Sequence, residues 1–321
     1  MKEALQLSSN NIYMGTSEAV NLGDSFVSII ISTHNRKNEL FRTIENIIET
    51  TDANYEIIVV SANSTDGTDE EILKRFPQVK LVLAPDVGWG EANNIGAKSA
   101  KGNYFFFSGP DMQFESGWLG YLLNKIRTIP NCGSIGTVLF REIENKGILI
   151  TGGSKLPFGY VIHKGIDLSE ENYKSYLRSD TIVEVDAVLY PLVPRDIFFA
   201  VGGFDPEFFY MCDEMDLGIR IKNSGYRNVV CFGKFMKTDM TKSSDKTFFF
   251  WNRNWVRLII KMDSLFLLPF FLLYPLIRLL YQFITLTLKK DNVRKKLLLD
   301  GIRYNIINFS RTHRSKNLRY V

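Results

Sequence analysis

Three clustered carboxylates, Asp213, Glu214 and Asp216, are the strongest candidates for acid–base chemistry in this chain of 321 residues. Carboxylates held close together raise one another's pKa, which suits a group that must accept a proton near neutral pH. The same residues also fit the first turn of a helix, where the helix dipole favours negative charge. Residue types alone leave a catalytic and a structural interpretation open.

The elements that must position such residues alternate between strands and helices. Residues 26–33 form an apolar run typical of a strand buried on both faces of a parallel sheet, and 37–50 carry an apolar stripe at helical spacing. The alternation continues with strands expected at 55–60, 79–83 and 104–107 and helices expected at 69–76 and 91–101. This series predicts an α/β fold of right-handed βαβ units, whose ligands bind beyond the carboxyl ends of the strands.

The middle of the chain is expected to complete the same domain. Its patterns predict a helix at 118–127, strands at 133–140 and 181–185, and a helix at 214–224 that ends before Gly225. We expect residues 141–180 to be loops and an excursion from the sheet.

Composition excludes several classes of protein. With 45% hydrophobic and 23% charged residues, the chain is too apolar for disorder. Three cysteines without a CxxC pair argue against a disulfide framework or a zinc finger, so a reducing compartment is expected, and three scattered histidines make a His-rich metal site improbable. The polar residues 1–24 show no obvious secretory signal.

Charge is divided unevenly along the chain. From Arg257 onward there are 13 Lys and Arg residues against 3 Asp and Glu residues, whereas the rest of the chain is mildly acidic. An acidic body argues against a nucleic-acid partner, and a basic tail suits an anionic surface.

An apolar segment near the end of the chain predicts contact with a membrane. Residues 265–288 are mostly apolar, but Pro269, Pro275 and Arg278 interrupt them, and the longest charge-free run, 264–277, has 14 residues. A spanning helix needs roughly 20 apolar residues. We therefore expect an interfacial or re-entrant helical pair, with a true span or a hydrophobic dimer interface as alternatives. The flanking basic residues are Arg253, Arg257, Lys261, Lys289, Lys290, Arg294, Lys295 and Lys296.

Four sequence blocks resemble the family 2 glycosyltransferases, which have the GT-A fold. The blocks are VSIIISTHNR, VVSANSTDGT, DVGWGEANNIGAKSAKGNYFFFSGPD and GGFDPEFFYMCDEMDLGIRIKNSGY, and they agree with the family in order and spacing over residues 26–245. The resemblance implies an enzyme that moves a sugar, with inversion, from a nucleotide-diphosphate sugar to a glycan or polyprenyl-linked acceptor. Within the family, the chain looks like the rhamnosyltransferase-like enzymes of cell-surface polysaccharide synthesis.

The resemblance also implies roles for particular residues. Glu214 would be the general base that deprotonates the acceptor hydroxyl, with Asp213 beside it, while Gly203 and Asp216 would lie on the acceptor side. The residues implied in donor binding are Thr33, Asn35, Ser61, Asp66, Asn93, Gly96 and Asp111. Ser61 departs from the family, which usually has an acidic residue there, and a hydroxyl cannot pair bidentately as a carboxylate can.

A divalent cation, Mg²⁺ or Mn²⁺, is a further implication of the resemblance. Asp111 would hold it against the donor diphosphate. Relatives commonly add a downstream histidine that this chain lacks, so Asp239 is either a substitute ligand or a solvated loop acid. The aromatic residues Trp89, Trp118 and Tyr210 could stack on sugar rings, although core packing is the better expectation for each one singly.

Three regions are expected along the chain. They are an N-terminal extension (1–25), a GT-A domain (26–247) and a C-terminal helical region that associates with a membrane (248–321). This arrangement predicts a peripheral protein on the cytoplasmic face of the cell membrane. The main alternative is a catalytically silent GT-A domain that serves as a binding or scaffold subunit. A nucleotidyltransferase is disfavoured because no Gly-rich basic loop follows the first strand, and a processive synthase because no Gln-x-x-Arg-Trp string occurs.

Overall fold

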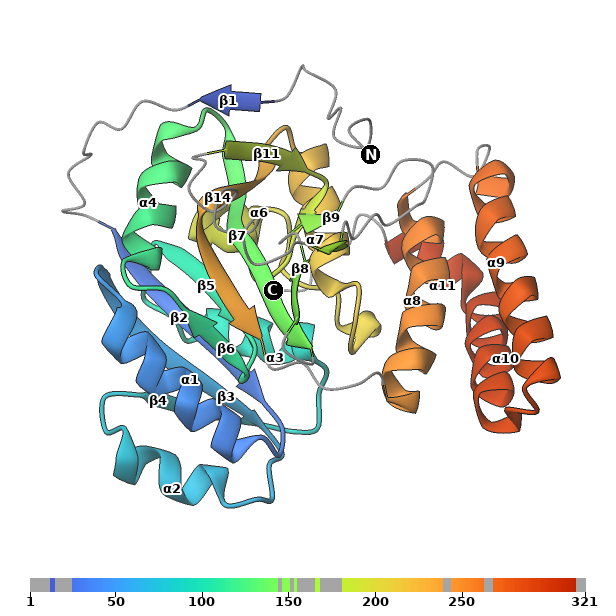
Figure 1. Cartoon of the computed structure of the whole chain (residues 1–321), viewed down its shortest axis with the longest axis horizontal. Helices are drawn as coiled ribbons and strands as arrows, with labels where there is room; N and C mark the ends of the chain where they lie inside the picture. Colours follow the sequence, from blue (N-terminus) through green and yellow to red (C-terminus); the bar gives the residue numbers. More distant parts are fainter. Residues whose placement is uncertain are drawn as a thin grey trace.

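The computed structural model describes residues 12–14, 25–143, 146–150, 153–154, 165–167, 181–238, 244–262 and 268–315. A large mixed sheet forms its centre, with helices on both faces and a group of C-terminal helices to one side (Figure 1). The four strands expected near the start of the chain are β2 (Phe26–Thr33), β3 (Asn54–Ala62), β4 (Lys80–Ala84) and β5 (Tyr104–Ser108). They are parallel, in the spatial order β5, β2, β3, β4, which confirms the predicted βαβ series.

Helices cover both faces of this sheet because its strands are apolar on both sides. Ile29 and Ile31 of β2 pack into the core under α1 (Lys37–Thr50), α2 (Thr68–Arg75) and α4 (Trp118–Thr128). The intervening Ile30 faces the opposite core, which includes residues of α3 (Trp89–Lys98), α6 (Arg195–Ala200) and α7 (Asp213–Asn223). Gly225 follows α7 with a φ of 88°, in agreement with the predicted helix end.

The second half of the sheet includes the strands expected at 133–140 and 181–185, together with strands that the sequence patterns did not predict. β14 (Arg227–Thr238) runs parallel to β7 (Cys132–Ile143), while β13 (Leu192–Pro194) is antiparallel to both β5 and β7. The remaining strands of this sheet are short antiparallel additions: β1 (Ile12–Met14), β6 (Met112–Phe114), β8 (Lys146–Ile150), β10 (Gly165–Asp167) and β11 (Thr181–Val185). β9 (Gly153–Ser154) and β12 (Ala187–Val188) pair with each other in a separate two-stranded sheet. The expectation of loops throughout 141–180 was therefore wrong where β8, β9 and β10 lie.

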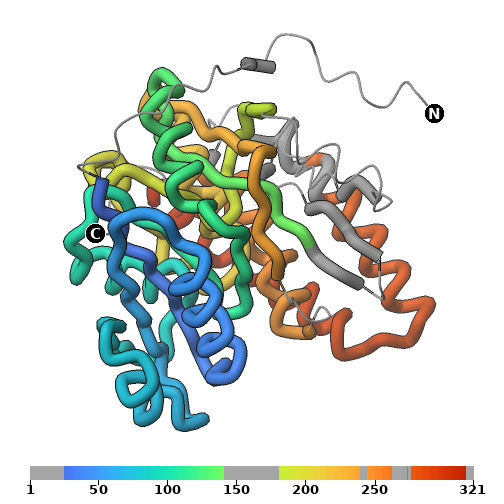
Figure 2. Tube along the Cα trace, turned by 60° about the vertical axis from the view of Figure 1, so that its left-hand side comes forward, coloured from blue at the N-terminus to red at the C-terminus, as the bar shows by residue number. Residues whose placement is uncertain are grey.

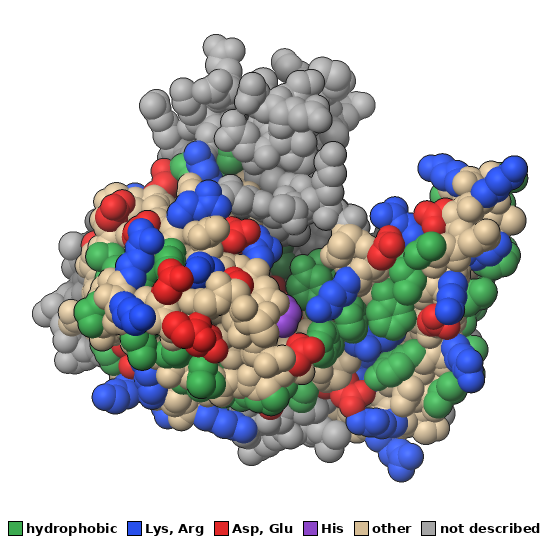
Figure 3. Space-filling model, turned by 90° about the horizontal axis from the view of Figure 1, so that it is seen from below, with side chains coloured by type: hydrophobic (Ala, Val, Ile, Leu, Met, Phe, Trp, Pro, Cys, Tyr) green, Lys and Arg blue, Asp and Glu red, His purple; other side chains and the backbone are tan. Residues whose placement is uncertain are grey.

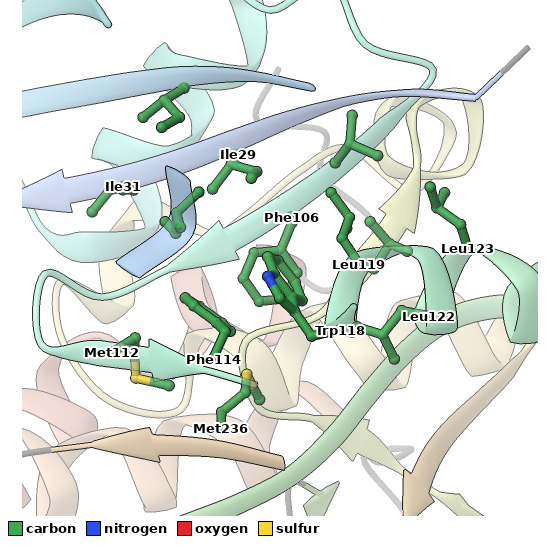
Figure 4. Close-up of a cluster of buried hydrophobic side chains, with 14 of the residues drawn as sticks. Ile29, Ile31, Phe106, Met112, Phe114, Trp118, Leu119, Leu122, Leu123 and Met236 are labelled. Atoms are coloured by element: carbon green, nitrogen blue, oxygen red, sulfur yellow. The ribbon is translucent and has the colours of Figure 1, made fainter. Parts of the chain in front are cut away.

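Trp118 belongs to the core and not to a sugar-binding surface. Its side chain is fully buried and stacks on Phe114 at a centroid distance of 4.2 Å, with Phe106 edge-on at 4.6 Å (Figure 4). The indole N–H donates to the Thr51 hydroxyl at 3.2 Å, which satisfies its polar atom. The structure thus favours the core-packing interpretation for this residue.

The C-terminal helices pack together on the side of the molecule away from α2 (Figures 1 and 2). They are α8 (Asp245–Met262), α9 (Leu268–Leu288), α10 (Asn292–Ile307) and α11 (Phe309–Arg314). A single helix, α9, occupies most of the segment for which we expected a helical pair, and its backbone continues through Pro275. Among the described residues, no helix is long and apolar enough to cross a membrane. The expected boundary at 247/248 falls in the first turn of α8, and the division into three regions stays a prediction.

Candidate active site

Two candidate donor-binding residues, Thr33 and Ser61, end neighbouring parallel strands. They are register partners in the β2–β3 ladder, so their side chains lie on the same face of the sheet. Both hydroxyl oxygens are buried and lack a hydrogen-bond partner within the described part of the chain. A buried hydroxyl without a partner is costly, so these two oxygens are unsatisfied polar groups at this edge of the sheet.

Asn35 and Asp66 organise the loops that follow these strands. Asn35 has a φ of 53°, and its side-chain oxygen accepts the Thr65 N–H at 2.7 Å. The Asp66 carboxylate accepts the N–H groups of Lys37 at 2.9 Å and Thr68 at 3.2 Å, at the first residues of α1 and α2. Burial pushes the pKa of Asp66 up, but its hydrogen bonds outweigh this effect and hold the pKa below its usual value. Asp66 therefore has a structural role, which is to fix the starts of α1 and α2.

The two candidate residues on α3, Gly96 and Asn93, differ in their surroundings. Gly96 packs against Ile30 of the sheet, whereas Asn93 has a side-chain oxygen without a partner within the described residues. A Cβ on Gly96 would lie 2.5 Å from Ile30, so this glycine allows α3 to pack closely on the sheet. Asn93 is fully buried; its amide nitrogen donates to the Trp89 carbonyl at 2.8 Å, and its oxygen has no partner within the described residues. The neighbouring Asn94 forms paired hydrogen bonds with the backbone N–H and C=O of Phe204, both at 2.9 Å. Sequence reasoning missed Asn94, which ties α3 to the turn after Gly203.

Asp111 and Glu214 are distant in the sequence but lie near the same two tyrosines. The pKa values of both Tyr190 and Tyr210 are raised, chiefly by burial and then by the negative charges of Asp111 and Glu214. Arg36 also faces Asp111, with 3.4 Å between its Nη2 and the carboxylate Oδ2. Both carboxylates therefore act on the same two tyrosines, and the Arg36 guanidinium lies beside Asp111.

The acid cluster begins α7 after a loop of unusual backbone conformation. Phe209, Met211 and Cys212 have φ values of 62°, 72° and 68°, which non-glycine residues seldom adopt. Such conformations cost free energy and persist only where neighbouring structure enforces them. The loop thus sets the direction of the first turn of α7.

Within that first turn, Asp213 and Glu214 have different surroundings. Asp213 is 1% exposed, and its Oδ1 has no hydrogen-bond partner within the described residues. Burial and then the charge of Glu214 raise the pKa of Asp213 well above its usual value. Glu214 is partly exposed, and desolvation raises its pKa from 4.5 to about 7. Glu214 is therefore the acid that can exchange a proton at neutral pH.

Asp216 belongs to a buried network of charges. Its carboxylate pairs with Arg220 at 2.6 Å and with Lys261 of α8 at 2.5 Å. Lys261 also reaches Asp205 at 2.7 Å, and Arg257 reaches the same Asp205 oxygen at 2.8 Å. The predicted acceptor-side residue Asp216 thus holds α7 against α8. Gly203, with a φ of 69°, lies in the turn that leads to Asp205.

The loop before α7 is also held by α8. Arg253 donates to the carbonyl oxygens of Glu207 and Phe208, both at 2.7 Å. Asn254 donates to the carbonyls of Phe208 and Met211 at 2.8 Å and to that of Tyr210 at 2.7 Å. These contacts overturn one expectation: Arg253, Arg257 and Lys261 are at most 7% exposed, so they are not basic residues that flank a membrane segment.

Comparison with known proteins identifies the family of this chain. The family model for glycosyl transferase family 2 matches residues 28–192, which include the four parallel strands and Asp111. This chain belongs to glycosyl transferase family 2. It is thus a glycosyltransferase, as the sequence blocks predicted.

Curated relatives of this glycosyltransferase include proteins of two named kinds. It is 27% identical to the O-antigen biosynthesis protein RfbC of Myxococcus xanthus, a match that covers 65% of this chain and 17% of that protein. It is 23% identical to the N-acetylglucosaminyl-diphospho-decaprenol L-rhamnosyltransferase of Mycobacterium tuberculosis, over 63% of this chain and 72% of the relative. It is 26% identical to the rhamnosyltransferase WbbL of Escherichia coli, over 63% of this chain and 78% of the relative.

A solved structure shows the same fold. The crystal structure of GalNAc-T7 with UDP, GalNAc and Mn²⁺ matches with a TM-score of 0.58 and 18% identity, covering 74% of this chain and 48% of that one. This match confirms the predicted GT-A fold.

The glycosyltransferase has few protein ligands for a metal ion within the described residues. That part of the chain contains no group of three His, Cys, Asp or Glu side chains able to hold one, and Asp239 lies outside it. Asp111 is 9% exposed beside the tyrosine pair. A Mg²⁺ ion typically takes one or two carboxylates together with substrate phosphates, so a single carboxylate fits a cation that arrives with the donor.

Several residues of the site were not predicted. Tyr190 and the polar residues of α8 give no local signal of function, because their partners are distant in the sequence. One pattern could have revealed α8: Arg253, Arg257 and Lys261 recur every four residues and share one helical face within an aromatic segment.

Of the remaining aromatic candidates, Trp89 packs edge-on against Phe204 at a centroid distance of 5.0 Å, and its side chain is partly exposed.

Proposed function

We propose that this glycosyltransferase moves a sugar, with inversion, from a nucleotide-diphosphate sugar to a hydroxyl of a cell-surface polysaccharide precursor. The observation that carries the proposal is Glu214, whose pKa of about 7 lets it accept a proton at neutral pH. An inverting transfer needs such a base at the acceptor hydroxyl, on the side opposite the leaving diphosphate. Asp111, which acts on the same two tyrosines, is suited to the diphosphate side.

The donor would occupy the edge of the sheet where β2 and β3 end. The hydroxyls of Thr33 and Ser61 would bond to its nucleoside, and Asn35 and Asp66 would shape the loops around it. On α3, Asn93 would offer its oxygen, while Gly96 would act through close packing. Asp111 would bind a divalent cation, Mg²⁺ or Mn²⁺, which neutralises charge on the diphosphate. The solved neighbour, which contains UDP and Mn²⁺, supports this class of donor and cation.

The acceptor would be a glycan carried on a lipid. The relative from Mycobacterium tuberculosis is named for a decaprenol-linked acceptor, which supports this class. Gly203 and Asp216 would form the acceptor side, Gly203 through its turn and Asp216 by fixing α7. A lipid-linked acceptor places the enzyme at a membrane surface, and we propose the cytoplasmic face with the C-terminal region 248–321 in contact.

A transfer assay tests the proposal. Purified protein is incubated with UDP-, GDP-, dTDP- and CMP-sugars, with and without Mn²⁺, and release of the nucleotide is measured. We expect turnover of one donor class by the wild-type protein and at least a hundredfold loss in Glu214→Gln, with donor binding retained. Glu49→Gln, an exposed carboxylate at the far end of α1, is the matched control. An active Glu214→Gln enzyme would refute the base assignment, and a folded wild-type protein inert towards every donor would favour a silent scaffold.

A further inference from the structure

One face of α9 carries a row of exposed apolar side chains between Leu273 and Leu288. Six aliphatic residues on this face are between 49% and 78% exposed: Leu273, Leu276, Ile277, Leu280, Ile284 and Leu288. Their spacing follows the helical repeat, so they form one continuous stripe. Tyr281 is 70% exposed within the same stripe. We refer to these seven residues as the α9 stripe.

A helix adapted to water directs its charged side chains towards the solvent, but α9 does not. Its single charged residue, Arg278, points inward, with its guanidinium 5.5 Å from the Trp255 ring of α8. Two hydroxyls near the end of the helix are satisfied internally, since Thr285 and Thr287 donate to backbone carbonyls four residues earlier at 2.8 Å. The outward surface therefore presents neither charge nor an unsatisfied hydroxyl from these residues.

Basic residues border the α9 stripe. Lys289 and Lys290 are exposed directly after it, and Lys296 and Arg303 are exposed on α10, which packs beside α9. In the view from below, Lys and Arg side chains and hydrophobic side chains share the surface of the C-terminal helices (Figure 3). An apolar face bordered by positive charge matches the acyl region and headgroups of an anionic lipid surface.

We infer that the α9 stripe docks this enzyme on an anionic lipid bilayer, lying in the interface with the basic residues at the headgroups. A second copy of the chain fits less well, because it would bring its own exposed Lys289, Lys290, Lys296 and Arg303 towards the same basic residues of the first. The inference deepens the membrane part of the proposed function and rests on it. It names a surface that differs from Arg253, Arg257 and Lys261 of α8, which are buried.

Co-sedimentation of the full chain with lipid vesicles tests the inference. The vesicles contain phosphatidylcholine alone or with added phosphatidylglycerol, and no sugar nucleotide is present, so failure here is distinct from failure of transfer. We expect binding that increases with phosphatidylglycerol. The double variant Leu276→Glu with Leu280→Glu should bind at least about tenfold more weakly, and Lys289→Glu with Lys290→Glu should lose the preference for phosphatidylglycerol.

A matched control carries two exposed leucines at the other end of the molecule. Leu73 of α2 and Leu83 of β4 are 47% and 66% exposed, so Leu73→Glu with Leu83→Glu makes the same chemical change away from α9 (Figure 1). This control should bind vesicles as the wild-type protein does, and circular dichroism verifies that every variant is folded. Vesicle binding that is absent, or equal in the α9 and control variants, would overturn the inference. So would a lipid-free dimer that only the α9 variant dissociates in sedimentation equilibrium.

Discussion

The side-chain nitrogen of Asn254 lies 2.8 Å from the carbonyl oxygen of Met211, two residues before Asp213. The same nitrogen reaches two further carbonyls of the loop, which links α8 directly to the backbone that aims the acid cluster. Since Met211 and Cys212 have positive φ values, this loop needs external support to keep its conformation. Asn254 therefore acts as a positioning residue for Glu214.

Replacement of Asn254 by alanine should lower kcat more than it changes the KM for the donor. The loop would lose three hydrogen bonds, and we expect kcat to fall roughly 10- to 100-fold because Glu214 loses its alignment. Steady-state kinetics with varied donor measures both constants. Asn252→Ala is the control, because Asn252 is also buried in α8 and, within the described residues, donates only to the Phe248 carbonyl of its own helix. Equal losses of kcat in the two variants would mean that general damage to α8, and not the loop, is responsible.

The pH dependence of the reaction should report the ionisation of Glu214. Because desolvation raises its pKa to about 7, kcat/KM should rise as pH increases through about 7 and level off above it. A pH–rate profile between about pH 5 and 9 measures this limb. A limb near 4.5, the ordinary value for glutamate, would show that Glu214 is not desolvated in the working enzyme.

The free energy of unfolding should fall as Glu214 ionises, whereas kcat/KM rises. The pKa of Glu214 is higher in the folded state than in the unfolded state, so the folded state loses stability as pH rises from 4.5 towards 7. Glu214→Gln removes that loss, and its free energy of unfolding should exceed that of the wild type by about 1–2 kcal/mol at pH 8 but little at pH 4. Urea denaturation at the two pH values measures the difference. No gain at high pH would contradict the assigned pKa.

Much of the fold could be predicted because its signals are local. The apolar run of β2 and the apolar stripe of α1 gave the observed bounds, and Gly225 marked the end of α7. β14 could not be predicted in the same way, since register shifts after Arg227 and Cys231 interrupt its alternation. β13 has only three residues and is defined by its neighbours in the sheet.

Site residues could likewise be predicted only where the signal was local in the sequence. The acid cluster could be found because its members are adjacent in sequence. The support from Asn254 and Lys261 could not, because each bonds to residues that lie about forty or more positions away and only the packing of α8 brings them together. The structural task of Asp66 was hidden for the same reason, since one of its partners is the first residue of α1.

Lys261 should contribute strongly to stability because it serves two buried carboxylates. Lys261→Met leaves Asp205 and Asp216 with one cation fewer, and we expect a loss of about 3 kcal/mol in the free energy of unfolding. Lys222→Met removes an exposed partner of Asp186 and should cost less than about 1 kcal/mol. Urea denaturation at neutral pH compares the two, and equal losses would contradict the importance of the network.

Acid denaturation adds a second measurement on the same network. Burial opposes ionisation of Asp205, but Lys261 and Arg257 lower its pKa from 3.8 to about 2. A lowered pKa stabilises the folded state above pH 3.8, and this stabilisation disappears as pH falls towards 2. Without Lys261 the pKa of Asp205 should be higher, so the loss on acidification should begin at a higher pH in Lys261→Met than in the wild type.

Two glycines with different surroundings test how tightly the acid cluster is packed. A Cβ on Gly90 of α3 would lie 2.7 Å from Asp213 Oδ1 and 3.0 Å from the Phe204 side chain, so Gly90→Ala must displace the first turn of α7. We expect at least a tenfold loss of kcat and a cost of about 1–3 kcal/mol in stability. On Gly301 of α10, the nearest atoms to a Cβ would be 3.6 Å away, at ordinary contact distance. Gly301→Ala should therefore keep full activity and gain up to about 1 kcal/mol from helix propensity. Kinetics and thermal unfolding of both variants measure the contrast, and a fully active Gly90→Ala enzyme would show that the position of Asp213 does not govern catalysis.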